Sequence, residues 1–234
     1  MRNATLLATA ILFTSSAPGA ARTWEDKKHH VSLEVDESAG WKIMDPDPQK
    51  RMLFVAAQPG DPPPLSVILL WAPVALGEDS INQHFITNFE AGQRDSMRKG
   101  GGKVTKLSSR RFKMDGVPAY ENAHQIEARG MKLQQVTRVT MANGRLYMLM
   151  GQGIGLDIER DRLVLPLMNS FKFTKKPGFK PFDVPNAGGE AGGVVDKDSE
   201  AYQIGFLVGQ IFIGALVLVL IIYLLRRKSR SRAQ

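Results

Sequence analysis

The fold is decided by residues 103–150, which read KVTKLSSRRFKMDGVPAYENAHQIEARGMKLQQVTRVTMANGRLYMLM. Apolar and polar residues alternate through much of this stretch, which is typical of β-strands because successive side chains point to opposite faces. The strands are separated by short turns, and Asp115-Gly116 and Asn143-Gly144 are dipeptides that two-residue hairpin turns prefer. We therefore predict an antiparallel meander of four strands. They are expected at residues 103–113, 117–129, 132–141 and 145–150.

Apolar residues in shorter runs before the meander predict further strands and then one long helix. From Ser80 the apolar period changes to that of a helix, and Gln83 follows at the spacing of a capping box. The helix is expected to end at residues 100–102, which are three glycines. The strands of this part are expected at residues 31–35, 40–44, 52–57 and 65–71.

A second helix is expected after the meander, begun by Asp157 and reaching about Ser170, with Pro166 bending or shortening it. The predicted fold class is therefore α+β, a sandwich in which a mainly antiparallel sheet is covered by two helices.

Four short segments occupy turn and core positions of this predicted domain. They are Gly40-Trp-Lys-Ile43, Gly116-Val-Pro-Ala-Tyr120, Asn143-Gly-Arg-Leu-Tyr147 and Asn169-Ser-Phe-Lys-Phe173. In these segments and in the order of its elements, the chain resembles the PsbP-like family of α/β/α sandwiches, which includes extrinsic photosystem proteins and uncharacterised bacterial proteins. The resemblance covers roughly residues 31–173 and implies the fold. The resemblance does not imply the manganese-, calcium- or GTPase-related roles of that family for this chain, because no binding motif matches.

The N-terminus has the parts of a secretory signal. Arg2 is followed by an apolar run to Phe13 and then by small residues up to Ala21. The apolar run is too short to cross a bilayer, and Pro18-Gly19 would end a helix. We expect residues 1–21 to be a signal peptide.

A membrane span is expected near the C-terminus. Residues 204–225 carry no charge, and at 1.5 Å per residue these 22 residues span about 33 Å as a helix, enough for a hydrocarbon core of about 30 Å. Acidic residues precede this stretch and basic residues follow it, which places residues 226–234 in the cytoplasm and the domain outside. The basic residues that set this topology are Arg226, Arg227, Lys228, Arg230 and Arg232.

Between the domain, expected at residues 22–175, and the span, residues 176–203 predict a flexible linker rich in proline and glycine. The whole chain has a net charge of +8, but five of its basic residues belong to the tail. The remaining charge of the domain is modest and gives no reason to expect binding of nucleic acid. Because the chain has no cysteine, disulfides and thiol chemistry are excluded.

No segment carries a catalytic or ligand-binding signature. Gly151-x-Gly153-x-Gly155 follows a strand, but Leu156 stands where a dinucleotide loop needs its last glycine. The four histidines lack the spacing of metal ligands on a helix, and no serine or cysteine nucleophile motif is present. We therefore expect no cofactor and a protein that is not an enzyme.

Two groups of residues are candidate contact sites. Gly205 and Gly209 form a Gly-x-x-x-Gly beside Gln210, a pattern that brings two membrane helices together and could make a dimer. A basic cluster could face anionic lipid or an acidic partner, or simply be a solvated strand edge that discourages pairing with other strands. The cluster contains Arg94, Arg98, Lys99, Lys103, Lys106, Arg110 and Arg111.

These observations predict a single-pass protein of the cell membrane, bound to the bilayer through residues 204–225 and displaying a PsbP-like interaction module outside the cytoplasm. Its partner would be a protein or a lipid at the cell envelope. Two alternatives stay open: an envelope hydrolase with dispersed catalytic residues, and a surface protein that is sorted and released.

Overall fold

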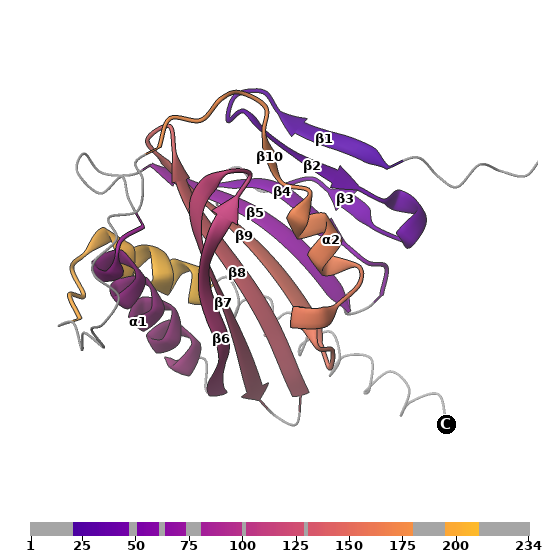
Figure 1. Cartoon of the computed structure of the whole chain (residues 1–234). Helices are drawn as coiled ribbons and strands as arrows, with labels where there is room; N and C mark the ends of the chain where they lie inside the picture. The colour runs from indigo at the N-terminus through magenta and orange to yellow at the C-terminus, as the bar shows by residue number, and fades with distance from the viewer. Residues whose placement is uncertain are drawn as a thin grey trace, which may run out of the picture.

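The computed structural model describes residues 21–46, 51–60, 64–73, 81–99, 102–128, 131–179 and 195–210. In these ranges the chain forms two β-sheets and several helices (Figure 1). The elements are β1 (Arg22–Asp26), β2 (Val31–Val35), β3 (Lys42–Met44), β4 (Met52–Ala57), β5 (Leu65–Pro73), α1 (Gln83–Lys99), β6 (Lys103–Met114), β7 (Val117–Ala128), β8 (Met131–Ala142), β9 (Arg145–Ile154), α2 (Val164–Asn169) and β10 (Lys172–Phe173). Short 3-10 helices lie at Glu37–Ala39 and Ile158–Arg160.

The larger sheet contains the predicted meander. Its strand order is β3-β4-β5-β9-β8-β7-β6, and every neighbouring pair is antiparallel. Both residues of Asp115-Gly116 and of Asn143-Gly144 have positive φ, the backbone that a tight hairpin turn requires. The prediction of an antiparallel meander is confirmed.

The smaller sheet, with strand order β1-β2-β10, was not predicted as a separate sheet. Strand β2 was expected, but its partners come from the two ends of the domain, and Phe173 of β10 pairs with Val31. Strand β10 has two residues, which is too short for an alternating pattern to be recognised. This sheet therefore depends on long-range pairing that no local pattern indicates.

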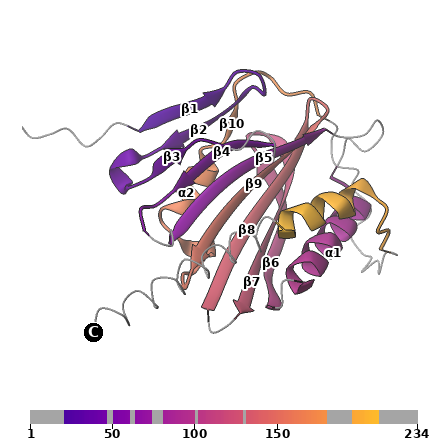
Figure 2. The same ribbon diagram turned by 180° about the vertical axis from the view of Figure 1, so that it is seen from behind.

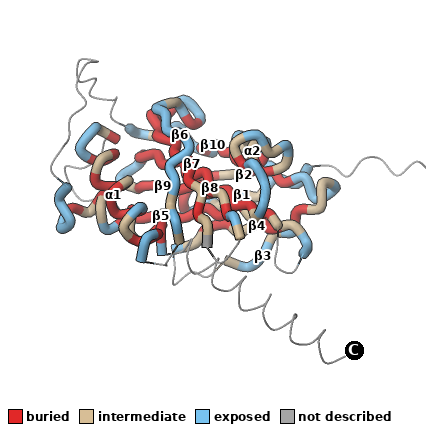
Figure 3. The backbone as a smooth tube through the Cα atoms, turned by 90° about the horizontal axis from the view of Figure 1, so that it is seen from below, coloured by how far each residue is buried: buried red, intermediate tan, exposed pale blue. Residues whose placement is uncertain are grey.

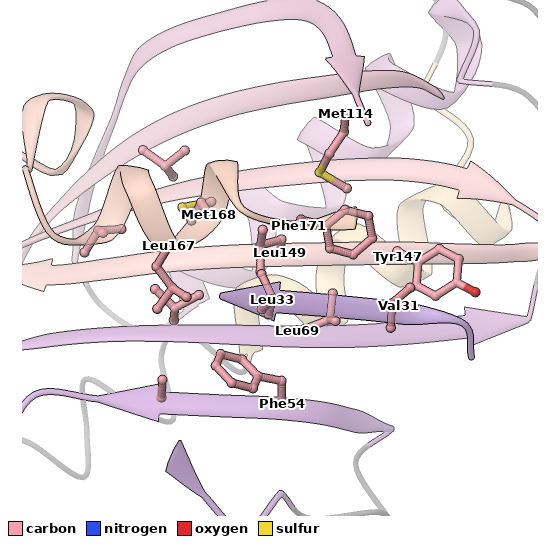
Figure 4. Packing of buried hydrophobic residues seen from close by; sticks show 14 of the residues in the cluster. Val31, Leu33, Phe54, Leu69, Met114, Tyr147, Leu149, Leu167, Met168 and Phe171 are labelled. Carbon is pink, nitrogen blue, oxygen red and sulfur yellow. The ribbon is translucent and has the colours of Figure 1, made fainter. Parts of the chain in front are cut away.

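One face of the larger sheet packs against the smaller sheet and α2. Figure 4 shows Leu33 of β2, Phe54 of β4 and Leu149 of β9 meeting in this core, with Phe171 and Met168 beside them. All five are buried. Rings also meet edge to face, as between Phe171 and Phe173, whose centroids lie 5.1 Å apart.

The opposite face is covered by α1 and by a helix at residues 200–210, called here the C-terminal helix (Figure 2). Apolar side chains of β5, β8 and β9 lie beneath these two helices. The central strands are consequently buried on both sides, as the red tubes of Figure 3 show. The fold is thus confirmed as α+β, although a second sheet shares the covering of the larger one.

The predicted span is described as far as Gln210, and residues 211–234 lie outside the described residues, as do residues 1–20. Within the described ranges, no helix combines the length and the apolar character needed to cross a membrane.

The helix ends differ in detail from the predictions. Asn82 caps α1, since its Oδ1 accepts a hydrogen bond of 2.8 Å from the backbone N–H of Phe85. Asp157 makes no side-chain capping bond. At the start of α2, the backbone N–H groups of Leu163 and Val164 instead donate to Oδ1 of Asp161, each at 2.8 Å. The predicted second helix is therefore split into a 3-10 turn and the short α2.

The glycines after the meander allow close packing of helix on strand. A Cβ on Gly151 would lie 2.4 Å from Val164 Cγ1, and one on Gly153 would lie 2.4 Å from Ile158 Cδ1. Both glycines belong to β9. They make room for α2 and the 3-10 turn, and this packing explains the glycines of the segment without a role in phosphate binding.

We expect Gly153→Ala to destabilise the chain by about 1–3 kcal/mol, since its methyl group would overlap Ile158 in a packed core. The control is Gly155→Asn. Gly155 has φ of 67°, nothing lies within 4 Å of its Cβ position, and asparagine tolerates this backbone. Urea unfolding of the full chain in detergent measures both changes. Equal midpoints for the two variants would contradict this view of the glycines.

Candidate interaction site

The C-terminal helix packs lengthwise on α1. Ala201, Ile204 and Val208 are buried and join the apolar cluster that contains Phe85 and Phe89 of α1. Burial of apolar side chains contributes roughly 25 cal/mol per Å2, so this contact stabilises the position of the helix. Residues from the start of the predicted span are thus part of the folded domain.

Three glycines bring the two helix backbones into contact. A Cβ on Gly205 would lie 2.0 Å from the carbonyl oxygen of Phe89, and a Cβ on Gly92 would lie 2.0 Å from that of Tyr202. A Cβ on Gly209 would lie 2.7 Å from the carbonyl oxygen of Gln93. No larger residue fits at these positions unless the helices move apart. We call this contact, formed by Gly92, Gly205 and Gly209, the glycine seam.

Polar contacts fix the register of the glycine seam. The backbone N–H of Asp196 donates to Asn88 Oδ1 at 2.8 Å, and the Tyr202 hydroxyl donates to Asp95 Oδ2 at 3.0 Å. Because Gly205 lies beside Phe89 whereas Gly209 lies beside Ser96, the two helices run in the same direction. Their C-terminal ends therefore lie together.

The structure places the predicted membrane-packing residues in two settings. Gly205 and Gly209 are buried against α1 of the same chain, whereas Gln210 is exposed. A dimer through this segment stays a prediction, and it would have to use another face of the helix or replace the seam. Sequence reasoning missed Gly92, since one glycine within a helix carries no pairing signal of its own.

The predicted linker also contacts the domain at both of its described ends. The backbone N–H of Gly178 donates to Asn143 Oδ1 at 2.8 Å, and Ser199 is buried. Residues 180–194 lie outside the described residues. The described residues on both sides of 180–194 therefore contact the domain.

The predicted basic cluster occupies α1 and the edge strand β6, and all seven side chains are exposed. Strand geometry divides it. Lys106 and Arg111 lie on the α1 face of the sheet, where Lys106 Nζ is 2.6 Å from Glu90 Oε1, whereas Arg110 points to the other face. The structure thus separates Arg94, Arg98 and Lys99, which lie on α1, from Arg110 on the other face of the sheet.

Arg110 lines a cavity of about 350 Å3 between β6, β8 and α2, called here the arginine pocket. Glu121 Oε1 accepts from Arg110 Nε at 2.7 Å, and its Oε2 accepts from Arg138 Nε at 2.6 Å. Arg138 Nη1 also donates to Asn169 Oδ1 at 2.8 Å. The residues that line the pocket are Ser108, Ser109, Arg110, Glu121, Val136, Arg138, Glu159, Leu165 and Asn169.

The charges of the arginine pocket are balanced. Burial raises the pKa of Glu121, but the hydrogen bonds from Arg110 and Arg138 outweigh burial, so its pKa lies below the ordinary value. Glu121 is therefore ionised and neutralises part of the arginine charge, while Glu159 adds a second acid that accepts from Ser108. Such a pocket can hydrogen-bond a small polar group. Among the described residues no histidine lines it.

A polar row crosses the sheet beneath the helices. Lys106, His124, Gln135, Gln152 and Ser66 lie opposite one another on five neighbouring strands. His124 is 3% exposed, and its Nδ1 has no hydrogen-bond partner in the described part of the chain. No alternating pattern indicates this row, because it forms across strands.

Burial lowers the pKa of His124 from 6.5 to about 4. The positive charges of Lys106 and Arg94 lower this pKa as well, and Glu90 opposes them. His124 is therefore neutral at pH 7. Over the described ranges, no group of three or more histidine, aspartate or glutamate side chains is arranged to hold a metal ion.

The topology-setting residues Arg226, Arg227, Lys228, Arg230 and Arg232 lie outside the described residues.

No protein-family model and no curated protein sequence matches the chain. Among solved structures, the chain is similar to cyanobacterial PsbP (CyanoP) from Synechocystis sp. PCC 6803, with a TM-score of 0.51 and 11% identity over 68% of this chain and 95% of that chain. It is also similar to LpqN of Mycobacterium tuberculosis, described as involved in cell envelope biogenesis, with a TM-score of 0.38 and 13% identity over 64% of this chain and 83% of that chain. The likeness to CyanoP confirms the PsbP-like fold that the sequence resemblance implied, and at this identity it shows the fold alone.

The first prediction for this site concerns the glycine seam. In a variant with Asp95→Cys and Tyr202→Cys, a short bismaleimide should join the two helices, and the chain has no other cysteine to react. Adding Gly205→Leu should reduce this crosslink about tenfold or more, because overpacking costs ~1–3 kcal/mol. Leu207→Ala is the control on the same helix, since Leu207 is 40% exposed. Unchanged crosslinking in Gly205→Leu would show that the seam is not a close contact.

His124 makes a second prediction. The pKa of His124 is lower in the folded chain than its ordinary value of 6.5. As the pH falls below 6.5, the unfolded chain therefore binds more protons than the folded chain, and the stability present above pH 6.5 is lost toward pH 4. We expect a loss of about 2 kcal/mol between pH 7 and pH 5, measured by urea unfolding. His124→Gln should remove most of this loss. His84→Gln, at an exposed position, should keep it. A similar pH dependence in both variants would assign the effect to other groups.

Proposed function

We propose that this chain is a non-enzymatic interaction module, held at the outer face of a cell membrane by a single span at residues 204–225. The observation that carries this proposal is the uncharged stretch of 22 residues at 204–225, and the glycine seam relates its first residues to the domain. The seam packs the first residues of the uncharged stretch on α1, so that the folded domain is continuous with the segment that would enter the bilayer. A domain joined to its anchor in this way is held at the membrane surface and does not swing on a long tether.

The sequence at both ends supports this orientation. Residues 1–21 have the composition of a secretory signal, and five basic residues follow the uncharged stretch. These two features are independent of each other, and both support a domain outside the cytoplasm.

The arginine pocket and the neighbouring edge strand β6 are the surface that we assign to a protein partner. Strand β6 extends over Lys103–Met114 at the edge of the sheet and is exposed along most of its length. The side chain of Arg110 is 63% exposed, and Arg138 behind it is held by Glu121 and Asn169. Acidic or amide groups of a partner could accept hydrogen bonds from Arg110 without a rearrangement of the pocket. Such preorganisation favours binding.

Protease protection of the full chain in a bacterial host tests the location and the topology. Protease added to intact spheroplasts should digest residues 22–175 and leave the last nine residues protected. Leu216→Arg with Leu220→Arg should release the protein from alkali-washed membranes, because each arginine at the centre of a span costs about 2.5–3.5 kcal/mol. Leu216→Ile with Leu220→Ile is the matched control. A domain that stays protected, or a double-arginine variant that stays in the membrane, would refute the proposal.

A further inference from the structure

The C-terminal helix belongs to the folded domain as far as Gly209. A Cβ on Gly209 would lie 2.7 Å from the carbonyl oxygen of Gln93, so the backbones of the two helices are in contact at this level. Val208 is fully buried in the same contact. One turn earlier, Lys99 Nζ of α1 lies 4.6 Å from the centroid of the Phe206 ring. Residues 204–209 of the uncharged stretch are therefore used to cover the domain.

Packing on α1 keeps these residues out of hydrocarbon. Gly209 lies beside Ser96, and the two helices run in the same direction, so the last turn of α1 would lie deeper in a bilayer than Gly209. That turn carries Arg98 and Lys99, and charged side chains are costly inside a bilayer. While the glycine seam is closed, only residues 211–225 are left for the span. As a helix these 15 residues reach about 22 Å, which is short of a hydrocarbon core of about 30 Å.

A span of full length requires the seam to open. Only the whole uncharged stretch of 22 residues, at 204–225, is long enough to cross the core without thinning it. The closed seam and the full span therefore exclude each other, because both use residues 204–210. Opening is opposed by exposure of Phe85 and Phe89, which the C-terminal helix helps to bury. Closing is opposed by the mismatch between a short span and the bilayer, and this cost grows with thickness.

We propose that the glycine seam is a switch that closes in thin bilayers and opens in thick ones. This inference rests on the proposed membrane anchor and deepens it by assigning a regulation to it. In a thin bilayer residues 204–210 pack on α1 and hold the domain against the membrane surface. In a thick bilayer they lengthen the span instead, and α1 loses its cover. Opening also releases Gly205 and Gly209, which then become available for pairing with the same face of a second copy of the chain.

The test uses the full chain with Asp95→Cys and Tyr202→Cys, whose crosslinking by a short bismaleimide reports a closed seam. It is placed in phosphatidylcholine vesicles with acyl chains of about 14 or about 22 carbons, which give thin and thick bilayers. We expect crosslinking to fall about fivefold or more in the thick bilayer. Five leucines inserted after Leu220 would bring residues 211–225 to about 20 residues, so crosslinking should then be equal in both vesicles. Five serines inserted after Gly189, in the predicted linker, add the same length elsewhere and should leave the difference unchanged.

Two results would overturn the inference. One is equal crosslinking in thin and thick bilayers, and the other is a difference that persists after the leucine insertion. Failure of the anchor itself would look different, because the protein would then be lost from both kinds of vesicle on an alkaline wash. Circular dichroism of each variant in the vesicles establishes that its domain is folded.

Discussion

The larger sheet is apolar on both faces, and the rest of the molecule is arranged to cover it. Side chains of β9 alternate between two clusters, with Tyr147 and Leu149 in one and Leu146 and Met148 in the other. Neither face can be left to water, because exposing buried apolar area costs roughly 25 cal/mol per Å2. One face receives the smaller sheet and α2. The other receives α1, and the C-terminal helix adds Ala201, Ile204 and Val208 to the same cluster (Figure 2).

This requirement places two demands on the residues that begin the uncharged stretch. They must be apolar to pack on the sheet, and we propose that they also lead into a bilayer. The glycine seam satisfies the first demand by letting the backbones of two helices meet, an arrangement common where membrane helices cross. A Gly-x-x-x-Gly pattern specifies a flat surface that another helix can approach, but it does not specify which helix. Here the partner is α1, which supplies a glycine of its own.

The same sheet also separates charges that are adjacent in the sequence. Arg110 and Arg111 follow each other on β6, so the first reaches the arginine pocket and the second lies on the α1 face. In the pocket, Arg138 comes from β8 and Glu121 from β7, and their contact depends on the register of two strand pairs. Charge density along the sequence therefore does not indicate which basic residues share a face of the sheet.

The sequence by itself determined the meander, the long helix and the fold class, because alternation, helical period and Asx-Gly turns are local properties of the chain. It also supports a signal and a span, which depend on composition. The tertiary structure decided the second sheet, the arginine pocket, the polar row through His124 and the docking of the C-terminal helix on α1. Each of these joins residues that are far apart in the chain, such as Phe173 with Val31 and Gly205 with Phe89. No local pattern encodes such pairings, since they arise from strand register and from which apolar face remains to be covered.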